Sequence, residues 1–160
     1  MKRVPINSLP VDKGIIEFIK NQKDIKIDKY SNKGGNSELF FGTHNILKKR
    51  VALKFYYIDS KSAHEEVKYL YEIKHENILG ALDAKLISSE YAFFLTPEIS
   101  GGDLDKFKNS HIINTYTALK IIKGLLAGVT ALHREPNRLV HRDLKPANIL
   151  INSSNTPIIA

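Results

Sequence analysis

The chain has 160 residues, of which 42% are hydrophobic and 26% are charged, as is ordinary for a folded globular protein. It contains no cysteine, which excludes disulfides, thiolate zinc sites and a cysteine nucleophile. Its net charge is +7, but the cations are scattered along the chain, so we expect no nucleic-acid partner. No run approaches the ~18 consecutive apolar residues typical of a membrane span. We therefore expect a cytoplasmic protein without such a span.

The first half of the chain is rich in strand signals. Residues 1–24 form an N-terminal extension with a weak indication of a short helix. Ile25 and Ile27 alternate with charged residues, which is typical of a half-buried strand. Two β-rich runs follow, residues 38–44 and 50–57, and the short turn between them predicts a hairpin.

One helix and two more strands are predicted next. Residues 62–65 have the S-x-x-E spacing of a capping box, so a helix should begin there. Residues 82–88 and 91–96 are predicted to form a strand pair that ends at Pro97. Gly101 and Gly102 then mark a boundary, because paired glycines interrupt regular structure.

Beyond this boundary the pattern becomes helical. Asn114 is a plausible N-cap, and apolar residues recur at helical spacing up to Pro136. The sequence thus predicts an α+β fold, in which a small antiparallel sheet with one helix (25–100) precedes the start of a helical part (101–160).

Small polar residues and glycines fill the turn between the first two predicted strands. Gly34 and Gly35, followed by Ser37, let backbone N–H groups approach phosphate oxygens because no Cβ stands in the way. An ordinary hairpin turn is the alternative interpretation.

A lysine in the middle of an apolar strand is the next candidate. Lys54 lies in Val51-Ala52-Leu53-Lys54-Phe55, where burying an unpaired ammonium would be costly. It either faces solvent or has a carboxylate partner. Glu66, on the inward side of the predicted helix, is the obvious partner, although it could be a plain surface carboxylate.

The most specific stretch is His141 to Asn148, which reads H-R-D-L-K-P-A-N. It places a carboxylate, a lysine and an amide at fixed offsets on one loop, as phosphoryl transfer requires. Asp143 can take the proton of an attacking hydroxyl, Lys145 can steady the moving phosphoryl group, and the Asn148 oxygen can hold Mg²⁺.

Together these signals resemble a eukaryotic-type protein kinase from about residue 25 to residue 160, and Lys145-Pro146 is typical of its Ser/Thr branch. The resemblance implies a protein-kinase-like fold, with a sheet lobe carrying one αC-type helix before an incomplete helical lobe. It also implies ATP and Mg²⁺ as cofactors and a protein substrate with a Ser or Thr acceptor. Asp143 would be the catalytic base, supported by Lys145, Lys54 and Glu66, with Asn148 as a metal ligand.

The same resemblance implies a nucleotide site. Lys54 would reach the α- and β-phosphates, and the hinge backbone would bind the adenine edge. The implied residues are Gly34, Gly35, Ser37 and Lys54 at the phosphates, Leu39, Ala52 and Leu150 around adenine, Thr96 as gatekeeper, Glu98 and Ile99 in the hinge, and Asp103 at the ribose.

Two departures weaken this interpretation. Only the middle glycine of the kinase G-x-G-x-x-G-x-V pattern is present, and the Asp-Phe-Gly tripeptide is missing after residues 157–160. We therefore expect a fragment of a kinase domain that binds ATP with little transfer activity of its own, and in which Ile121, Ile122 and Leu126 lack part of their packing partners. The alternatives are a non-catalytic, pseudokinase-like module that binds ATP or a protein, and a small-molecule kinase of related fold.

Overall fold

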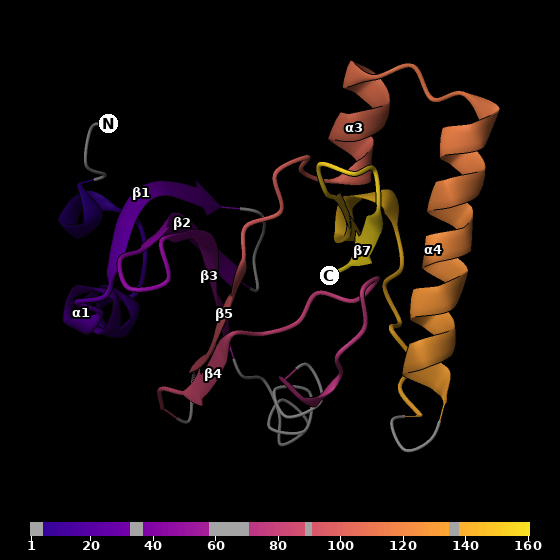
Figure 1. Ribbon diagram of the computed structural model, residues 1–160. Coiled ribbons are helices and arrows are strands. Elements are labelled where there is room, and N and C mark those ends of the chain that lie inside the picture. The colour runs from indigo at the N-terminus through magenta and orange to yellow at the C-terminus, as the bar shows by residue number, and fades with distance from the viewer. Residues whose placement is uncertain (1–4, 33–36, 58–70, 89–90, 135–137) are drawn as a thin grey trace. The chain divides into compact units, whose positions relative to one another are not determined.

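A computed structural model describes residues 5–32, 37–57, 71–88, 91–134 and 138–160 (Figure 1). The chain forms two compact units, each described here by itself. The first comprises Met1–Tyr71 and Ala81–Glu98, and the second comprises Glu72–Gly80 and Ile99–Ala160. The capping box predicted at residues 62–65 lies outside the described residues. The division into an ATP-binding and a catalytic part stays a prediction.

The first unit contains a five-stranded sheet, as the strand signals predicted. Its strands are β1 (Ile25–Asn32), β2 (Ser37–His44), β3 (Lys49–Tyr57), β4 (Asp83–Leu86) and β5 (Tyr91–Pro97). Every neighbouring pair is antiparallel, in the order β1-β2-β3-β5-β4. The α+β class with a small antiparallel sheet is therefore confirmed.

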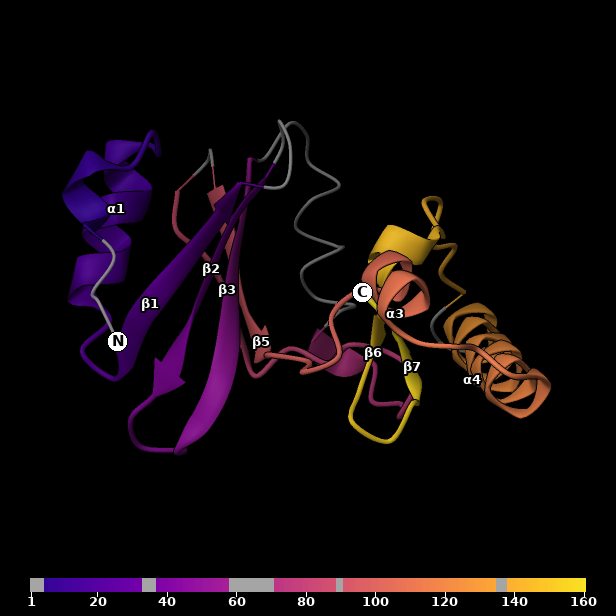
Figure 2. The same cartoon turned by 90° about the horizontal axis from the view of Figure 1, so that it is seen from above.

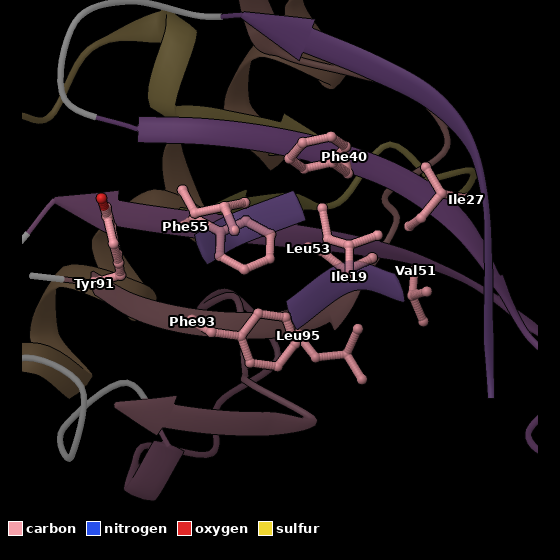
Figure 3. Packing of buried hydrophobic residues seen from close by; sticks show 10 residues of the cluster. Ile19, Ile27, Phe40, Val51, Leu53, Phe55, Tyr91, Phe93 and Leu95 are labelled. Atoms are coloured by element: carbon pink, nitrogen blue, oxygen red, sulfur yellow. The ribbon is translucent and has the colours of Figure 1, made fainter. Parts of the chain in front are cut away.

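One face of this sheet is buried beneath α1 (Lys13–Asn21), as Figure 2 shows. Asp12 caps the helix by accepting a hydrogen bond from the Gly14 amide. The helix places Phe18 against the rings of Phe55 and Phe93, with centroid distances of 5.8 and 4.9 Å. Helix α1 therefore completes the core of the sheet. The cluster drawn in Figure 3 comprises Ile15, Ile19, Ile27, Phe40, Val51, Leu53, Phe55, Tyr91, Phe93 and Leu95.

A single carboxylate lies among these apolar side chains, on β2. Glu38 is 7% exposed and accepts hydrogen bonds from the hydroxyls of Tyr30, at 2.6 Å, and Tyr57, at 3.3 Å. Burial and the hydrogen bond to Glu38 raise the pKa of Tyr30 to about 12. Burial, together with the charge of Glu38, also raises the pKa of Tyr57. The two phenols satisfy a carboxylate that would otherwise be costly to bury.

The described residues of the second unit contain two helices, α3 (Leu104–Ser110) and α4 (Thr115–His133). The 3₁₀ turn η2 (Pro146–Asn148) leads into a short hairpin formed by β6 (Ile149–Ile151) and β7 (Pro157–Ile159). Asn114 caps α4 through a hydrogen bond from the Thr117 amide, as predicted. The helix ends at His133, and Arg134 after it has an extended backbone. Helix α3 was not predicted, because its seven residues are too short to show a period.

Asn77 joins three segments of this unit. Its side-chain amide donates to the Pro157 carbonyl at 2.8 Å, and its own carbonyl accepts from the Ile159 amide at 2.9 Å. Gly124 and Gly128 on α4 leave the room that this contact needs. A Cβ at Gly128 would lie 2.9 Å from the Asn77 oxygen, so the helix approaches only because both positions are glycine.

The expectation about the packing of α4 was partly wrong. Ile121 is 5% exposed and packs with Phe107, Ile149 and Ile151, because β6 and α3 cover that side of the helix. Ile122 and Leu126 are 53% and 64% exposed. Among the described residues, α4 is the one helix that is long and apolar enough to cross a membrane, by length and composition alone. One such helix is weak evidence, and the absence of a membrane span stays a prediction.

Candidate functional site

The face of the sheet opposite α1 carries five of the eleven residues predicted to bind a nucleotide. Strand β3 alternates, so Ala52 and Lys54 point away from the core formed by its neighbours. Lys54 is paired in register with Leu39 on β2 and with Phe94 on β5, and Ala52 is paired with Thr96. Residues directly opposite in an antiparallel sheet share a face. Leu39, Ala52, Lys54 and Thr96 therefore form one continuous surface.

Lys54 is half-buried on this surface. Its Nζ lies 4.2 Å from the centroid of the Tyr56 ring, two residues further along β3. This distance is within the range of a cation–π interaction. Ser37 pairs with Tyr56 across β2 and β3, so it lies at the same end of the surface.

The residues predicted at the hinge are divided between the two units. In the first unit, Arg50 donates from Nε to the Glu98 carboxylate at 2.7 Å, and its carbonyl accepts from the Glu98 amide. Arg50 also forms a bidentate ion pair with Asp28, at the irregular step of β1. In the second unit, the Ile99 carbonyl accepts from the amide of Gly102 at 3.3 Å.

Asp103 has a structural function that the sequence analysis missed. It is the N-cap of α3, where Oδ1 accepts from the Lys106 amide at 2.9 Å and Oδ2 pairs with the Lys106 ammonium at 2.7 Å. Its side chain is 7% exposed. Its backbone also bridges to Leu150 on β6, so these two predicted nucleotide contacts are neighbours. The predicted ribose contact stays a prediction.

Three of the five residues predicted for catalysis and metal binding lie together in the second unit. The Lys145 ammonium is 2.8 Å from Oδ2 of Asp143, and the Asn148 side-chain amide donates to the same oxygen at 2.9 Å. The same amide donates to the Asp143 carbonyl at 2.9 Å. The Asp143 side chain is 63% exposed. The loop thus presents an accessible carboxylate that is held by two neighbours.

Backbone hydrogen bonds fix the shape of this loop. The Asp143 amide donates to the His141 carbonyl at 2.8 Å, a tight turn that places Arg142 at a φ of +63°. The Asn148 amide donates to the Lys145 carbonyl, and the Ala160 amide donates to the Asn148 carbonyl, both at 2.9 Å. A non-glycine residue at positive φ is uncommon and costs free energy, which the surrounding bonds must offset.

The hydrogen bonds to the Asp143 side chain also shift the pKa of its carboxyl group. The hydrogen bond from Lys145 lowers the pKa of the Asp143 carboxyl, and the hydrogen bond from Asn148 adds to this effect. Asp143 is therefore ionised at neutral pH, as an acceptor for a hydroxyl proton must be.

The described residues contain no group of three or more His, Asp or Glu side chains that could hold a metal. The Asn148 amide oxygen and the Asp143 carboxylate are the donors that the loop supplies. This set fits Mg²⁺, which takes one or two protein oxygens and completes its shell with water and substrate phosphates.

Three predicted site residues, Gly34, Gly35 and Glu66, lie outside the described residues. Besides the capping function of Asp103, two features were missed by sequence reasoning, namely the Asp28–Arg50–Glu98 network and the contact of Tyr56 with Lys54. The first joins residues far apart in sequence, so no local pattern indicates it. The second could have been found, because residues two apart in a strand share a face.

A family profile described as "Protein kinase domain" matches residues 32–160. The chain is 41% identical over 102 residues to cell division control protein 2 homolog 3 of Trypanosoma brucei brucei, a match that covers 62% of the chain and 32% of that protein. It is 30% identical over 159 residues to the probable serine/threonine-protein kinase fhkA of Dictyostelium discoideum, covering 88% of the chain and 26% of that protein. It is also 35% identical over 95 residues to mitogen-activated protein kinase HOG1A of Wallemia ichthyophaga, covering 59% and 25%.

The chain belongs to the protein kinase domain family, whose profile matches most of its length. The match spans about a third or less of the length of each of these relatives.

Proposed function

We propose that the protein transfers the γ-phosphoryl group of ATP to Ser or Thr hydroxyls of protein substrates, and that the 160 residues themselves bind ATP. The observation that carries this proposal is the grouping of Lys145 and Asn148 around one oxygen of Asp143, at 2.8 and 2.9 Å. A lysine, an amide and an ionised carboxylate with access to solvent are the groups that a hydroxyl acceptor and a γ-phosphate require.

Each loop residue has a distinct part in this proposal. Asp143 orients the acceptor hydroxyl and accepts its proton, because its carboxyl is ionised and accessible. Lys145 neutralises charge on the transferred phosphoryl group and leaves its ion pair with Asp143 when phosphate binds. Asn148 would hold Mg²⁺ through its amide oxygen, and the ion would neutralise charge on the phosphates.

The sheet supplies the proposed nucleotide surface. Leu39 and Ala52 offer apolar contact to adenine, and Thr96 lies beside Ala52 at its edge. Lys54 offers a cation to the phosphates from the same surface. The remaining site residues belong to the proposal because they match the family pattern. They are Gly34, Gly35 and Ser37 at the phosphates, Glu98 and Ile99 at the adenine edge, Leu150 beside adenine, Asp103 at the ribose, and Glu66 as partner of Lys54. We further propose a cytoplasmic location, without a nucleic-acid partner.

ATP binding tests the first part. The melting temperature of the chain is measured with and without ATP and Mg²⁺, for the wild type, Lys54→Ala and the matched control Lys49→Ala on the same strand. Ligand at ~100 times its dissociation constant stabilises a folded protein by about 2.7 kcal/mol. We expect that stabilisation in the wild type and the control and its loss in Lys54→Ala. No shift in a wild type that melts cooperatively would refute ATP binding.

Transfer is tested in the longest natural protein that contains this sequence. Radiolabel from the γ-phosphate should appear on Ser and Thr of a panel of protein acceptors, and Asp143→Asn should lower the rate by about 10²–10⁴-fold. ATP binding without transfer to any acceptor would favour the non-catalytic, pseudokinase-like alternative, which the degenerate glycine pattern also favours.

A further inference from the structure

The aromatic ring of Tyr56 lies against the ammonium of Lys54 on the proposed nucleotide surface. The Lys54 ammonium lies 4.2 Å from the centre of the Tyr56 ring, within the range of about 6 Å over which an aromatic face attracts a cation. Both side chains project from the same face of β3, because they are two residues apart in a regular strand.

The orientation of the Tyr56 ring is itself fixed. Phe94 on β5 packs edge-to-face against it, with centroids 5.3 Å apart and planes at 85°. Phe94 is buried, and it is also the register partner of Lys54. Lys54, Tyr56 and Phe94 therefore form one packed group. Phe94 fixes the orientation of the Tyr56 ring, and the ring fixes the position of the Lys54 ammonium.

The position of this group matters because of what surrounds it. Tyr56 pairs with Ser37, at the start of β2 next to the predicted phosphate turn, whereas Lys54 pairs with Leu39. The ring thus draws the ammonium toward the end of the sheet where the phosphates are proposed to lie, and away from the adenine contacts at Ala52 and Thr96.

We propose that Tyr56 is a positioning residue for phosphate binding, which keeps the Lys54 ammonium directed along β3 toward the phosphate end. This inference rests on the proposed function, because it gives Tyr56 a role in ATP recognition. It predicts that Tyr56 contributes to binding of the triphosphate and not to binding of the nucleoside, since only the phosphates meet Lys54.

The test compares ATP with adenosine on the full chain. Dissociation constants for both ligands are measured by calorimetry for the wild type, Tyr56→Leu, Tyr56→Phe and Lys54→Met. Tyr56→Leu should reduce the preference for ATP over adenosine by about two- to five-fold. Tyr56→Phe keeps the aromatic face and should keep the wild-type preference for ATP over adenosine. In the Lys54→Met background, Tyr56→Leu should cause no further loss.

A second readout needs no nucleotide. The rate at which an amine-reactive reagent modifies Lys54 is measured by peptide mass spectrometry at constant pH. Loss of the ring should raise this rate about two- to five-fold in Tyr56→Leu and leave it near the wild-type value in Tyr56→Phe. Tyr116→Leu, at an exposed tyrosine on α4, is the control for a general effect.

The outcomes separate the two proposals. If the wild type prefers ATP and Tyr56→Leu does so equally, the role of Tyr56 is overturned while ATP binding stands. Equal losses of the ATP preference in Tyr56→Phe and Tyr56→Leu would assign the effect to the hydroxyl or to packing. They would also overturn the proposed role of the Tyr56 ring. If the wild type does not prefer ATP, the proposed function fails and the role in phosphate binding fails with it. The labelling rates then decide whether the ring holds the ammonium.

Discussion

The Nε atom of Arg50 donates a hydrogen bond to a carboxylate oxygen of Glu98 at 2.7 Å, and so ties the start of β3 to the segment that follows β5. The other end of the same guanidinium binds Asp28, which is 11% exposed, and contacts the Thr43 hydroxyl at 3.3 Å. One cation thereby connects three strands near the predicted hinge.

Replacing Arg50 by Met should lower the free energy of unfolding by about 1 kcal/mol. The ion pair is partly exposed, which limits its net contribution, but the change leaves Asp28 without this partner in a largely buried place. Chemical denaturation measures the effect. The exposed neighbour Lys49→Met is the control and should stay within about 0.5 kcal/mol. Equal stability of the two variants would contradict a role for the network.

Replacing Lys145 by Met should raise the pKa of Asp143 toward its usual value of 3.8, because the strongest cause of its depression is removed. Carboxyl ¹³C shifts followed by NMR between pH 2 and 6 measure this directly. Since the pKa is lowered in the folded protein, the associated stability is present above pH 3.8 and is lost as the pH falls through the folded value. Lys145→Arg keeps the cation and should keep the depression. An unchanged Asp143 titration in Lys145→Met would show that the ion pair does not persist in solution.

Tyr30 should ionise near pH 12, well above its usual 10. Glu38→Gln should lower this pKa only part of the way, because burial, the largest cause, remains. The raised pKa means that the stabilisation is complete below pH 10 and is lost as the pH rises toward 12. Absorbance at 295 nm, with Tyr30→Phe to assign the signal, follows the ionisation. A Tyr30 that titrates at its usual value would exclude the buried hydrogen bond to Glu38.

Gly128→Ala should destabilise the protein by about 1–3 kcal/mol, although alanine is the better helix former. The new Cβ would lie 2.9 Å from both the Asn77 oxygen and the Cδ1 of Ile159, and overpacking of this kind outweighs the gain of about 1 kcal/mol in helix propensity. Thr130→Ala, at an exposed position of the same helix, should instead be neutral or slightly stabilising. Thermal denaturation distinguishes the two, and a higher melting temperature in Gly128→Ala would show that α4 does not approach Asn77 this closely.

The sequence by itself determined the elements whose signals are local. Alternation at Ile25 and Ile27, the hairpin ending at Tyr57 and the strand pair before Pro97 predicted all five strands of the sheet, because a strand's side chains alternate between its faces. Asn114 predicted the start of α4, because a cap is a contact between near neighbours. The H-R-D-L-K-P-A-N string likewise holds Asp143, Lys145 and Asn148 within one loop, so their meeting needed little from the rest of the chain.

Tertiary structure alone decided the contacts between distant segments. Arg50 and Glu98 are 48 positions apart, and Asn77 and Pro157 are 80 apart, so no local period indicates either pair. The same holds for which side of α4 is buried, since β6 and α3 cover Ile121 and leave Ile122 exposed. Asp103, predicted as a nucleotide contact, also caps α3. Such choices depend on which surfaces meet after the chain has folded, and the free energy of those contacts is absent from any short stretch of sequence.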